Sequence, residues 1–90
     1  MRASNNLKGR ERTLQVRFKL DAVDKIAARE GLTTEAERAA FFGVRPSNWS
    51  RVVNGVTAPG KDFIAAVLAS HPEDQRVRWD NLFEIVEVVS

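Results

Sequence analysis

Residues 42–55 read FGVRPSNWSRVVNG, and this stretch decides the fold. Gly43 follows a helical pattern and allows a sharp turn, because glycine adopts a positive φ at little steric cost. Pro46 then opens a new helix, where the N–H that proline lacks is not needed. Asn54 and Gly55 end this helix, since both tolerate the left-handed conformation. The stretch therefore predicts a helix-turn-helix, a motif whose second helix enters the major groove of DNA.

A resemblance to a known family rests on a wider set of positions in the same region. Between Gly43 and Pro59 the chain carries Gly43-Val44, Trp49, Val52, Gly55 and Pro59. In these residues, and in their ungapped spacing, it resembles the Cro/CI-type (lambda-repressor-like) family. That family has Gly, an aliphatic residue, Ile or Val, an aliphatic residue, Gly and Pro there. The resemblance extends over about residues 20–69.

The chain departs from the family pattern at three places. Arg38-Ala39 stands where the family usually has Leu-Ala inside the first motif helix. Trp49 is large for its position, and the segment before Gly43 is one residue longer than usual. These departures put the register of the first motif helix in question, but they leave the second helix and its following loop aligned.

The resemblance implies a mainly α, four- to five-helix lambda-repressor-like domain. It also implies a sequence-specific double-stranded DNA-binding transcriptional regulator, such as a Cro-like or immunity-type repressor of a phage or mobile element. Such a protein would work in the cytoplasm of a bacterial or phage-infected cell. Two alternatives share the fold: a DNA-binding accessory factor (an antitoxin or a recombination directionality protein), and a protein-interaction module that has lost DNA binding.

Length and composition indicate one small globular domain. Ninety residues give room for a single core, and a content of 43% hydrophobic and 29% charged residues is typical of globular chains. The chain has no cysteine, so disulfides and thiolate zinc sites are excluded. The sequence holds no apolar run as long as the ~18 residues of a membrane span, and we expect no membrane partner.

The net charge of +2 is unevenly distributed. Residues 1–20 hold six basic residues and one acid, and residues 45–61 hold three basic residues and no acid. Residues 21–44 carry a net charge of −2 and residues 62–90 one of −4. A DNA-facing surface is expected to lack acids, because phosphates repel carboxylates. The charge pattern therefore favours DNA contacts from the N-terminal arm and from the second motif helix with its loop.

The rest of the sequence predicts strands and helices on both sides of the motif. Residues 13–20 alternate polar and apolar side chains, as a half-buried strand does. Thr34 and Glu37 form the Thr-x-x-Glu pair that caps the start of a helix. The expected elements are a basic arm over residues 1–12, a strand over 13–20, helices over 22–30, 34–42, 46–53 and 61–70, a helical turn near 80–83, and a strand over 85–89.

Several side chains are expected to cap helices or to fill the core. Asp21 and Asp80 are predicted to cap the helix over 22–30 and the last helical turn, which holds Leu82 and Phe83. Both tryptophans are expected to be core anchors, since buried aromatic residues dominate small cores. The expected core side chains are Leu14, Val16, Phe18, Leu20, Val23, Ile26, Ala27, Ala36, Ala39, Ala40, Phe42, Trp49, Val52, Val53, Phe63, Ile64, Val67, Leu68 and Trp79.

The DNA-contact candidates lie on the second motif helix, its loop and the arm. The N-terminal part of a recognition helix approaches base edges, while residues further along meet phosphates. We therefore expect Arg45, Ser47 and Arg51 to reach into the groove. The full set of candidates is Arg45, Pro46, Ser47, Asn48, Ser50, Arg51, Asn54, Thr57, Lys61, Thr34, Arg10 and Arg12.

The C-terminal segment is the candidate for assembly. One recognition helix reads only a few base pairs, so proteins of this kind commonly bind a palindromic operator as homodimers. A short β-branched strand needs a partner for its backbone. That partner is either the strand over 13–20 of the same chain or the same strand of a second subunit, and both remain open at this point. The candidate dimerisation residues are Phe83, Ile85, Val86 and Val88.

The sequence contains no signal for an enzyme, a metal site or a cofactor. His71 stands beside a proline without Cys, Asp or Glu at metal-ligand spacing. The pairs Asp21/Asp24 and Glu35/Glu37 fall in first helical turns, where the helix dipole favours acids. Their expected role is capping rather than acid–base chemistry.

Overall fold

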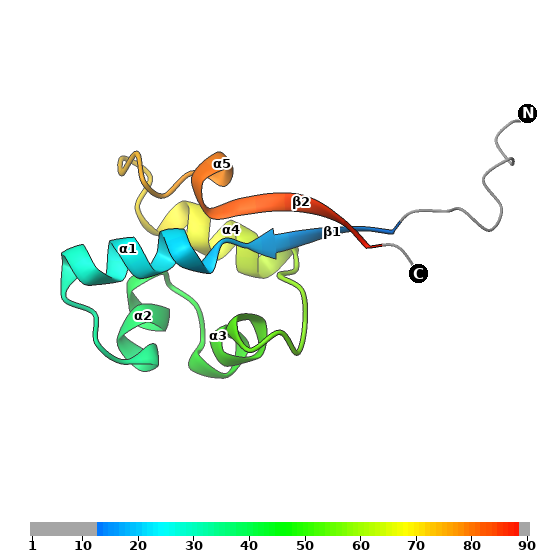
Figure 1. The fold of residues 1–90 in the computed structure, drawn as a ribbon. Helices are drawn as coiled ribbons and strands as arrows, with labels where there is room; N and C mark the ends of the chain where they lie inside the picture. Colours follow the sequence, from blue (N-terminus) through cyan, green and yellow to red (C-terminus); the bar gives the residue numbers. More distant parts are fainter. Residues whose placement is uncertain (1–12, 89–90) are drawn as a thin grey trace, which may run out of the picture.

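The computed structural model describes residues 13–88, in which helices predominate. Two strands pair in a small sheet, as Figure 1 shows, and the ribbon they form projects past the helices. This part of the chain confirms the mainly α architecture with short strands near both ends. In chain order its elements are β1 (Thr13–Phe18), α1 (Leu20–Glu30), α2 (Glu35–Phe41), α3 (Pro46–Val53), α4 (Lys61–Ser70), α5 (Trp79–Leu82) and β2 (Phe83–Val88).

The ribbon answers the question of where the C-terminal strand pairs. β2 runs antiparallel to β1, in a register from Thr13 opposite Val88 to Phe18 opposite Phe83. Its apolar face is buried only at the base of the ribbon. Phe18 and Phe83 lie in the core, whereas Leu14 and Ile85 on the same face are 59% and 54% exposed. The predicted alternation of side chains is therefore correct, but the outer half of the apolar face stays open.

The chain leaves β1 and enters α1 two residues earlier than the sequence predicts. β1 stops at Phe18, and Lys19 is the N-cap of α1: its N–H donates to the Leu82 carbonyl at 2.8 Å. Leu20 is therefore the first helical residue and is 41% exposed, and Asp21 lies in the first turn instead of capping it. The tertiary bond from Lys19 to Leu82, which local sequence does not encode, fixes this bend.

The last helical turn differs from its prediction for a similar reason. Arg78 is the N-cap of α5, and Asp80 lies within the first turn. Phe83 is extended and begins β2, two residues before the predicted start, because it pairs with Phe18 across the ribbon. Val89, the last residue of the predicted strand, falls outside residues 13–88.

Five aromatic rings form the centre of the core. The ring centroid of Phe18 lies 5.0 Å from that of Phe63, 5.1 Å from that of Phe83 and 5.5 Å from that of Trp49. Phe42 stacks on Trp49 at 5.5 Å with an interplanar angle of 10°. These rings come from both strands, from α3 and α4, and from the end of α2. Each such contact contributes about 0.5–1.5 kcal/mol beyond the burial of apolar area.

Besides Leu14 and Leu20, three more of the predicted core residues are exposed. Ala39 and Phe42 are fully buried, but Ala36 and Ala40 are exposed. With about 100° per residue, these two alanines lie on the solvent side of the face that Ala39 and Phe42 define. Trp79 is 40% exposed, because it stacks over Phe83 from outside at 5.3 Å.

The loop between α4 and α5 is held by an arginine. Arg76 binds both Asp74 and Glu30, with Nη2–O distances of 2.7 and 2.8 Å, so it ties the loop to the end of α1. The hydrogen bonds from Arg76 lower the pKa of Asp74 to about 2. Earlier in the same loop, the His71 ring stacks on Phe41 and its Nε2 lies 2.8 Å from the Phe41 carbonyl oxygen.

The lowered pKa of Asp74 predicts how the stability of the domain depends on pH. The pKa falls from 3.8 to about 2 on folding, so the ionised carboxylate stabilises the fold fully above pH ~4. This contribution is lost as the pH falls through about 2. We expect Asp74→Asn to lower the free energy of unfolding at pH 7 by about 1 kcal/mol, after allowance for solvent screening.

Urea unfolding of both proteins between pH 7 and pH 2 measures this difference, which should shrink below pH ~4. Glu73→Gln, which removes the neighbouring exposed carboxylate, is the matched control and should leave the pH dependence unchanged. An Asp74→Asn difference that is the same at pH 7 and pH 2 would contradict the assignment.

Candidate nucleic-acid interface

The turn between α2 and α3 is closed by two backbone hydrogen bonds around a glycine. Gly43 has a φ of 71°. Its N–H donates to the Ala40 carbonyl at 3.2 Å, and the N–H of Val44 donates to the Ala39 carbonyl at 2.9 Å. This pair of bonds is the Schellman motif, which satisfies the last carbonyls of a helix. The predicted sharp turn at Gly43 is confirmed, and it sets the direction in which α3 leaves.

The start of α2 is fixed by the predicted capping pair. The Thr34 hydroxyl oxygen accepts a bond from the Glu37 N–H at 3.1 Å, and Glu37 Oε1 accepts from the Thr34 N–H at 3.1 Å. A further bond from the Thr33 N–H, at 2.7 Å, is the main cause that lowers the pKa of Glu37. Thr34 is exposed, so it lies at the surface as a DNA-contact candidate must, although its hydroxyl oxygen already accepts the capping bond.

Trp49 seats α3 against the rest of the domain. Its side chain is 1% exposed and packs among the aromatic rings of the core. Its indole N–H donates to Glu35 Oε1 at 2.6 Å, so the buried donor is satisfied. The expected core role of Trp49 is confirmed. Because Trp49 and Val52 point inward, the opposite face of α3 is turned to solvent.

The outward face of α3 gathers most of the predicted contact residues. The helix spans Pro46–Val53, the same bounds that the sequence predicts. Lys61 is exposed at the start of α4, and Thr57 in the intervening loop is half-buried. Arg10 and Arg12 fall outside residues 13–88. The exposed residues on and beside α3 are Arg45, Pro46, Ser47, Asn48, Ser50, Arg51 and Asn54.

The loop after α3 turns back along β1. Gly55 has a φ of 77°, and the N–H of Val56 donates to the Arg51 carbonyl at 2.8 Å in a second Schellman motif. Residues 55–59 then line one side of a groove of about 360 Å³, whose other side is β1. The groove is largely aliphatic, with Val16, Val52 and Val56 among its lining residues.

Two carboxylates that the sequence places before the turn lie beside α3 in the fold. Asp24 of α1 and Glu35 of α2 line a small depression together with Asn54. Asp24 is paired with Arg38 at 2.8 Å. Glu35 is bonded only to the neutral indole of Trp49 among residues 13–88, so this bond leaves its charge uncompensated. The acid-free residues 45–61 are thus bordered by the negative charge of Glu35. No pattern in the sequence reveals that Glu35 lies beside α3.

Basic side chains on this surface are available for an anionic partner. Within residues 13–88, Arg45, Arg51 and Lys61 form no ion pair. In the same part of the chain, no three of His, Asp, Glu or Cys gather closely enough to hold a metal ion. The helices described are each too short or too polar to span a membrane.

Comparison with known proteins identifies no relative of this chain. No protein-family model, curated protein or solved structure matches this chain.

Substitution of Gly43 tests the geometry of the turn. A Cβ at this position would come no closer than 3.9 Å to other atoms, so the cost of Gly43→Ala arises from the positive φ alone. We expect a loss of about 1–2 kcal/mol in the free energy of unfolding, measured with urea. Gly43→Asn is the matched control and should cost less, because asparagine tolerates the left-handed region. Equal losses for the two variants would show that φ does not set the cost.

Proposed function

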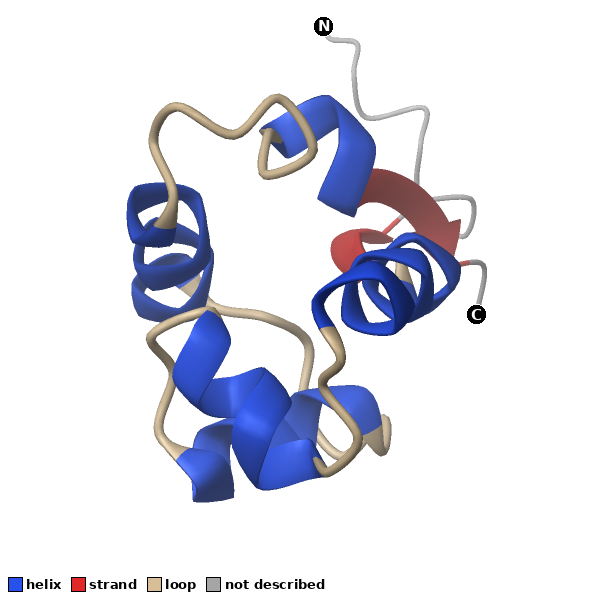
Figure 2. Cartoon of the chain, turned by 90° about the vertical axis from the view of Figure 1, so that its left-hand side faces the viewer, coloured by secondary structure: helices blue, strands red, loops and turns tan. Residues whose placement is uncertain are grey.

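We propose that this protein is a sequence-specific double-stranded DNA-binding transcriptional regulator on a lambda-repressor-like helix-turn-helix. In this proposal it acts as a Cro-like or immunity-type repressor of a phage or mobile element. The observation that carries the proposal is the outward face of α3. It is polar and basic, and a buried tryptophan and two Schellman turns hold it rigidly. Figures 1 and 2 show α2 and α3 next to each other along the lower side of the molecule, below α1 and α4.

The contacts divide by their place along α3. Arg45, Ser47 and Arg51 lie on its N-terminal and central part, and these residues read base edges. Arginine bonds guanine O6 and N7 together, which contributes about 1–3 kcal/mol of discrimination. The residues further along and in the loop hold the phosphates, with Asn54 pre-positioned by its 3.1 Å bond to Ser50 Oγ. The arm residues Arg10 and Arg12 follow the DNA backbone or minor groove.

The partner of this surface is a palindromic operator bound by a homodimer. β2 already pairs with β1, and Phe83 lies in the core, so the free surface for assembly is the outer half of the ribbon. There Ile85 and Val88 are 54% and 41% exposed, and Val86 is half-buried. Exposed aliphatic side chains on a ribbon favour pairing with another chain. Two-fold pairing of ribbons would present two copies of α3 to one palindrome.

The substitution Arg51→Ala tests the DNA-reading proposal. Duplexes are first selected from a random library, and affinity is then measured by fluorescence anisotropy at fixed salt on the selected site and on random DNA. We expect a loss of about 1–3 kcal/mol on the selected site and a smaller loss on random DNA. Arg78→Ala removes an exposed arginine away from α3 and is the matched control.

Three results of this experiment would count against the proposal or part of it. Equal losses on both DNAs would make Arg51 a phosphate contact. No loss on either would mean that α3 is not the reading surface. A library from which no duplex is enriched would contradict sequence-specific binding altogether.

The double substitution Ile85→Lys/Val88→Lys tests assembly through the ribbon. Both side chains are exposed in the monomer, one on each face of the ribbon, so the variant should keep its helical circular dichroism while the lysines on either face repel their copies in a second subunit. We expect sedimentation to show a monomer that binds the operator without cooperativity. Ala65→Lys, on the exposed side of α4, is the control for added charge. An unmodified protein that stays monomeric on its operator would rule the homodimer out.

A further inference from the structure

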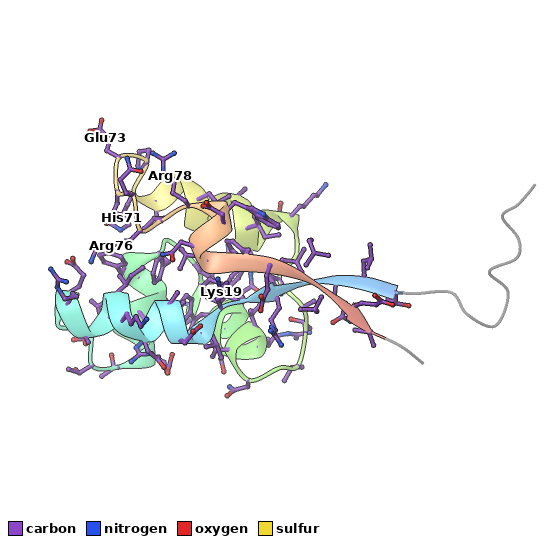
Figure 3. All side chains as sticks on the ribbon, turned by 45° about the horizontal axis from the view of Figure 1, so that its top comes forward. Lys19, His71, Glu73, Arg76 and Arg78 are labelled. Carbon is purple, nitrogen blue, oxygen red and sulfur yellow. The ribbon has the colours of Figure 1, made fainter. Side chains whose placement is uncertain are left out.

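A second cluster of positive charge lies on α1, away from the helix-turn-helix. Lys19, Lys25 and Arg29 line a groove of about 330 Å³ between α1 and the segment that leads into α5, and we call it the α1–α5 groove. Its far wall carries Arg76 and Asn81. Figure 3 labels Lys19 and Arg76, which lie along the side of α1 next to this segment. The volume falls within the range of small-molecule sites, about 300–1,000 Å³.

Three of the cations in this groove have no ion-pair partner in the described part of the chain. Within residues 13–88, no carboxylate forms an ion pair with Lys19, Lys25 or Arg29. Lys25 and Arg29 are four residues apart on one helix, where like charges repel and destabilise it. Asp21, which also lines the groove and precedes Lys25 by one turn, forms no ion pair with it. A bound anion would relieve this repulsion.

Arg76 shapes the groove but is not itself free. Its guanidinium is engaged by Asp74 and Glu30, and this pairing holds the wall of the groove against the end of α1. The Asn81 side-chain amide donates to the Arg76 carbonyl at 2.7 Å and holds the same wall. The wall of the groove formed by Arg76 and Asn81 is therefore held in place by hydrogen bonds and ion pairs. The three cations without ion pairs lie on the α1 wall.

The groove faces away from α3. At about 100° per residue, Lys25 and Arg29 lie nearly opposite Leu20 and Asp24 on α1, and the latter two line the depression beside Trp49. Figures 1 and 2 agree that α5 lies on one side of α1, and α2 and α3 on the other. A duplex lying on α3 therefore leaves the α1–α5 groove accessible.

We propose that the α1–α5 groove binds the phosphate group of a small molecule. A phosphate carries up to two negative charges on one compact group, which matches three cations around one concavity. A DNA backbone that crossed the groove would run past Asp21, Glu30 and Asp74 in turn, whereas a single phosphate group can lie beside Lys25 and Arg29, a turn or more from Asp21. Lys25 and Arg29 lie one helical turn apart on α1, so both side chains can reach one phosphate group, and Lys19 lies about 9 Å further toward the start of the helix. This proposal does not rest on DNA binding by α3.

The test is a titration of the full chain, labelled with ¹⁵N, by inorganic phosphate, pyrophosphate, ribose 5-phosphate and AMP at constant ionic strength. We expect saturable amide shifts over residues 19–29 and 76–81. The ligand with the highest affinity identifies the source of the phosphate: a free ion, a sugar phosphate or a nucleotide. Lys25→Gln/Arg29→Gln should weaken binding about tenfold or more, because charged hydrogen bonds are lost while glutamine preserves the helix.

The matched control removes one arginine and one lysine from the other face. Arg45→Gln/Lys61→Gln should bind phosphate compounds as the unmodified protein does. On duplex DNA the expected order reverses: this control variant loses affinity, and Lys25→Gln/Arg29→Gln keeps it. Failure of the phosphate proposal and failure of the DNA proposal thus give different results.

Three outcomes would overturn the phosphate site. The first is a Lys25→Gln/Arg29→Gln variant that is folded by circular dichroism and binds phosphate compounds as tightly as the unmodified protein. The second is a set of shifts centred on α3. The third is tighter binding at residues 19–29 by a glutamate-rich peptide or by random duplex DNA than by any of the four phosphate compounds.

Discussion

The packing of Trp49 is the contact on which the rest of the structure depends. Its ring joins α3 to β1, α4 and the end of α2, and its indole N–H would be unsatisfied in the core without Glu35. A buried donor without a partner costs about 1–3 kcal/mol, so the carboxylate must stay at the start of α2. The same contact turns the polar side of α3 outward. The packing of Trp49 therefore determines both the packing of the core and the orientation of the candidate interface.

This constraint has an electrostatic consequence for the proposed interface. Glu35 satisfies the tryptophan, but its negative charge stays beside a surface proposed to meet phosphates. A unit charge about 4 Å away in water costs about 1 kcal/mol, which lowers affinity for any DNA sequence alike. Asp24 avoids such a cost through its pair with Arg38. Arg38 thus has a physical role at this surface, since it neutralises one of the two acids near α3.

The features that the sequence predicted well are those that depend on neighbours in the chain. The capping pair of Thr34 and Glu37, the positive φ at Gly43 and the bounds of α3 each follow from a few adjacent residues. The bend at Lys19 and the exposure of Trp79 depend on contacts with distant segments, so local patterns missed them. The same distinction between local and distant contacts applies to the two candidate sites. The outward face of α3 was predictable from its own periodicity, whereas the α1–α5 groove exists only because the Arg76 bonds bring a distant loop against α1.

The ribbon shows why pairing within the chain and assembly between chains do not exclude each other. Pairing with β1 satisfies the backbone of β2 along one edge and buries Phe83, but the helices cover only the base of the ribbon. Beyond that base, Leu14 on β1 and Ile85 on β2 share one face and remain in water. At about 25 cal/mol per Å² of apolar area, covering such side chains stabilises whatever arrangement removes them from solvent. The sheet within the chain is thus paired over its full length but buried only over its inner half. The inner half completes the monomer's core, and the outer half leaves apolar area whose burial would favour association.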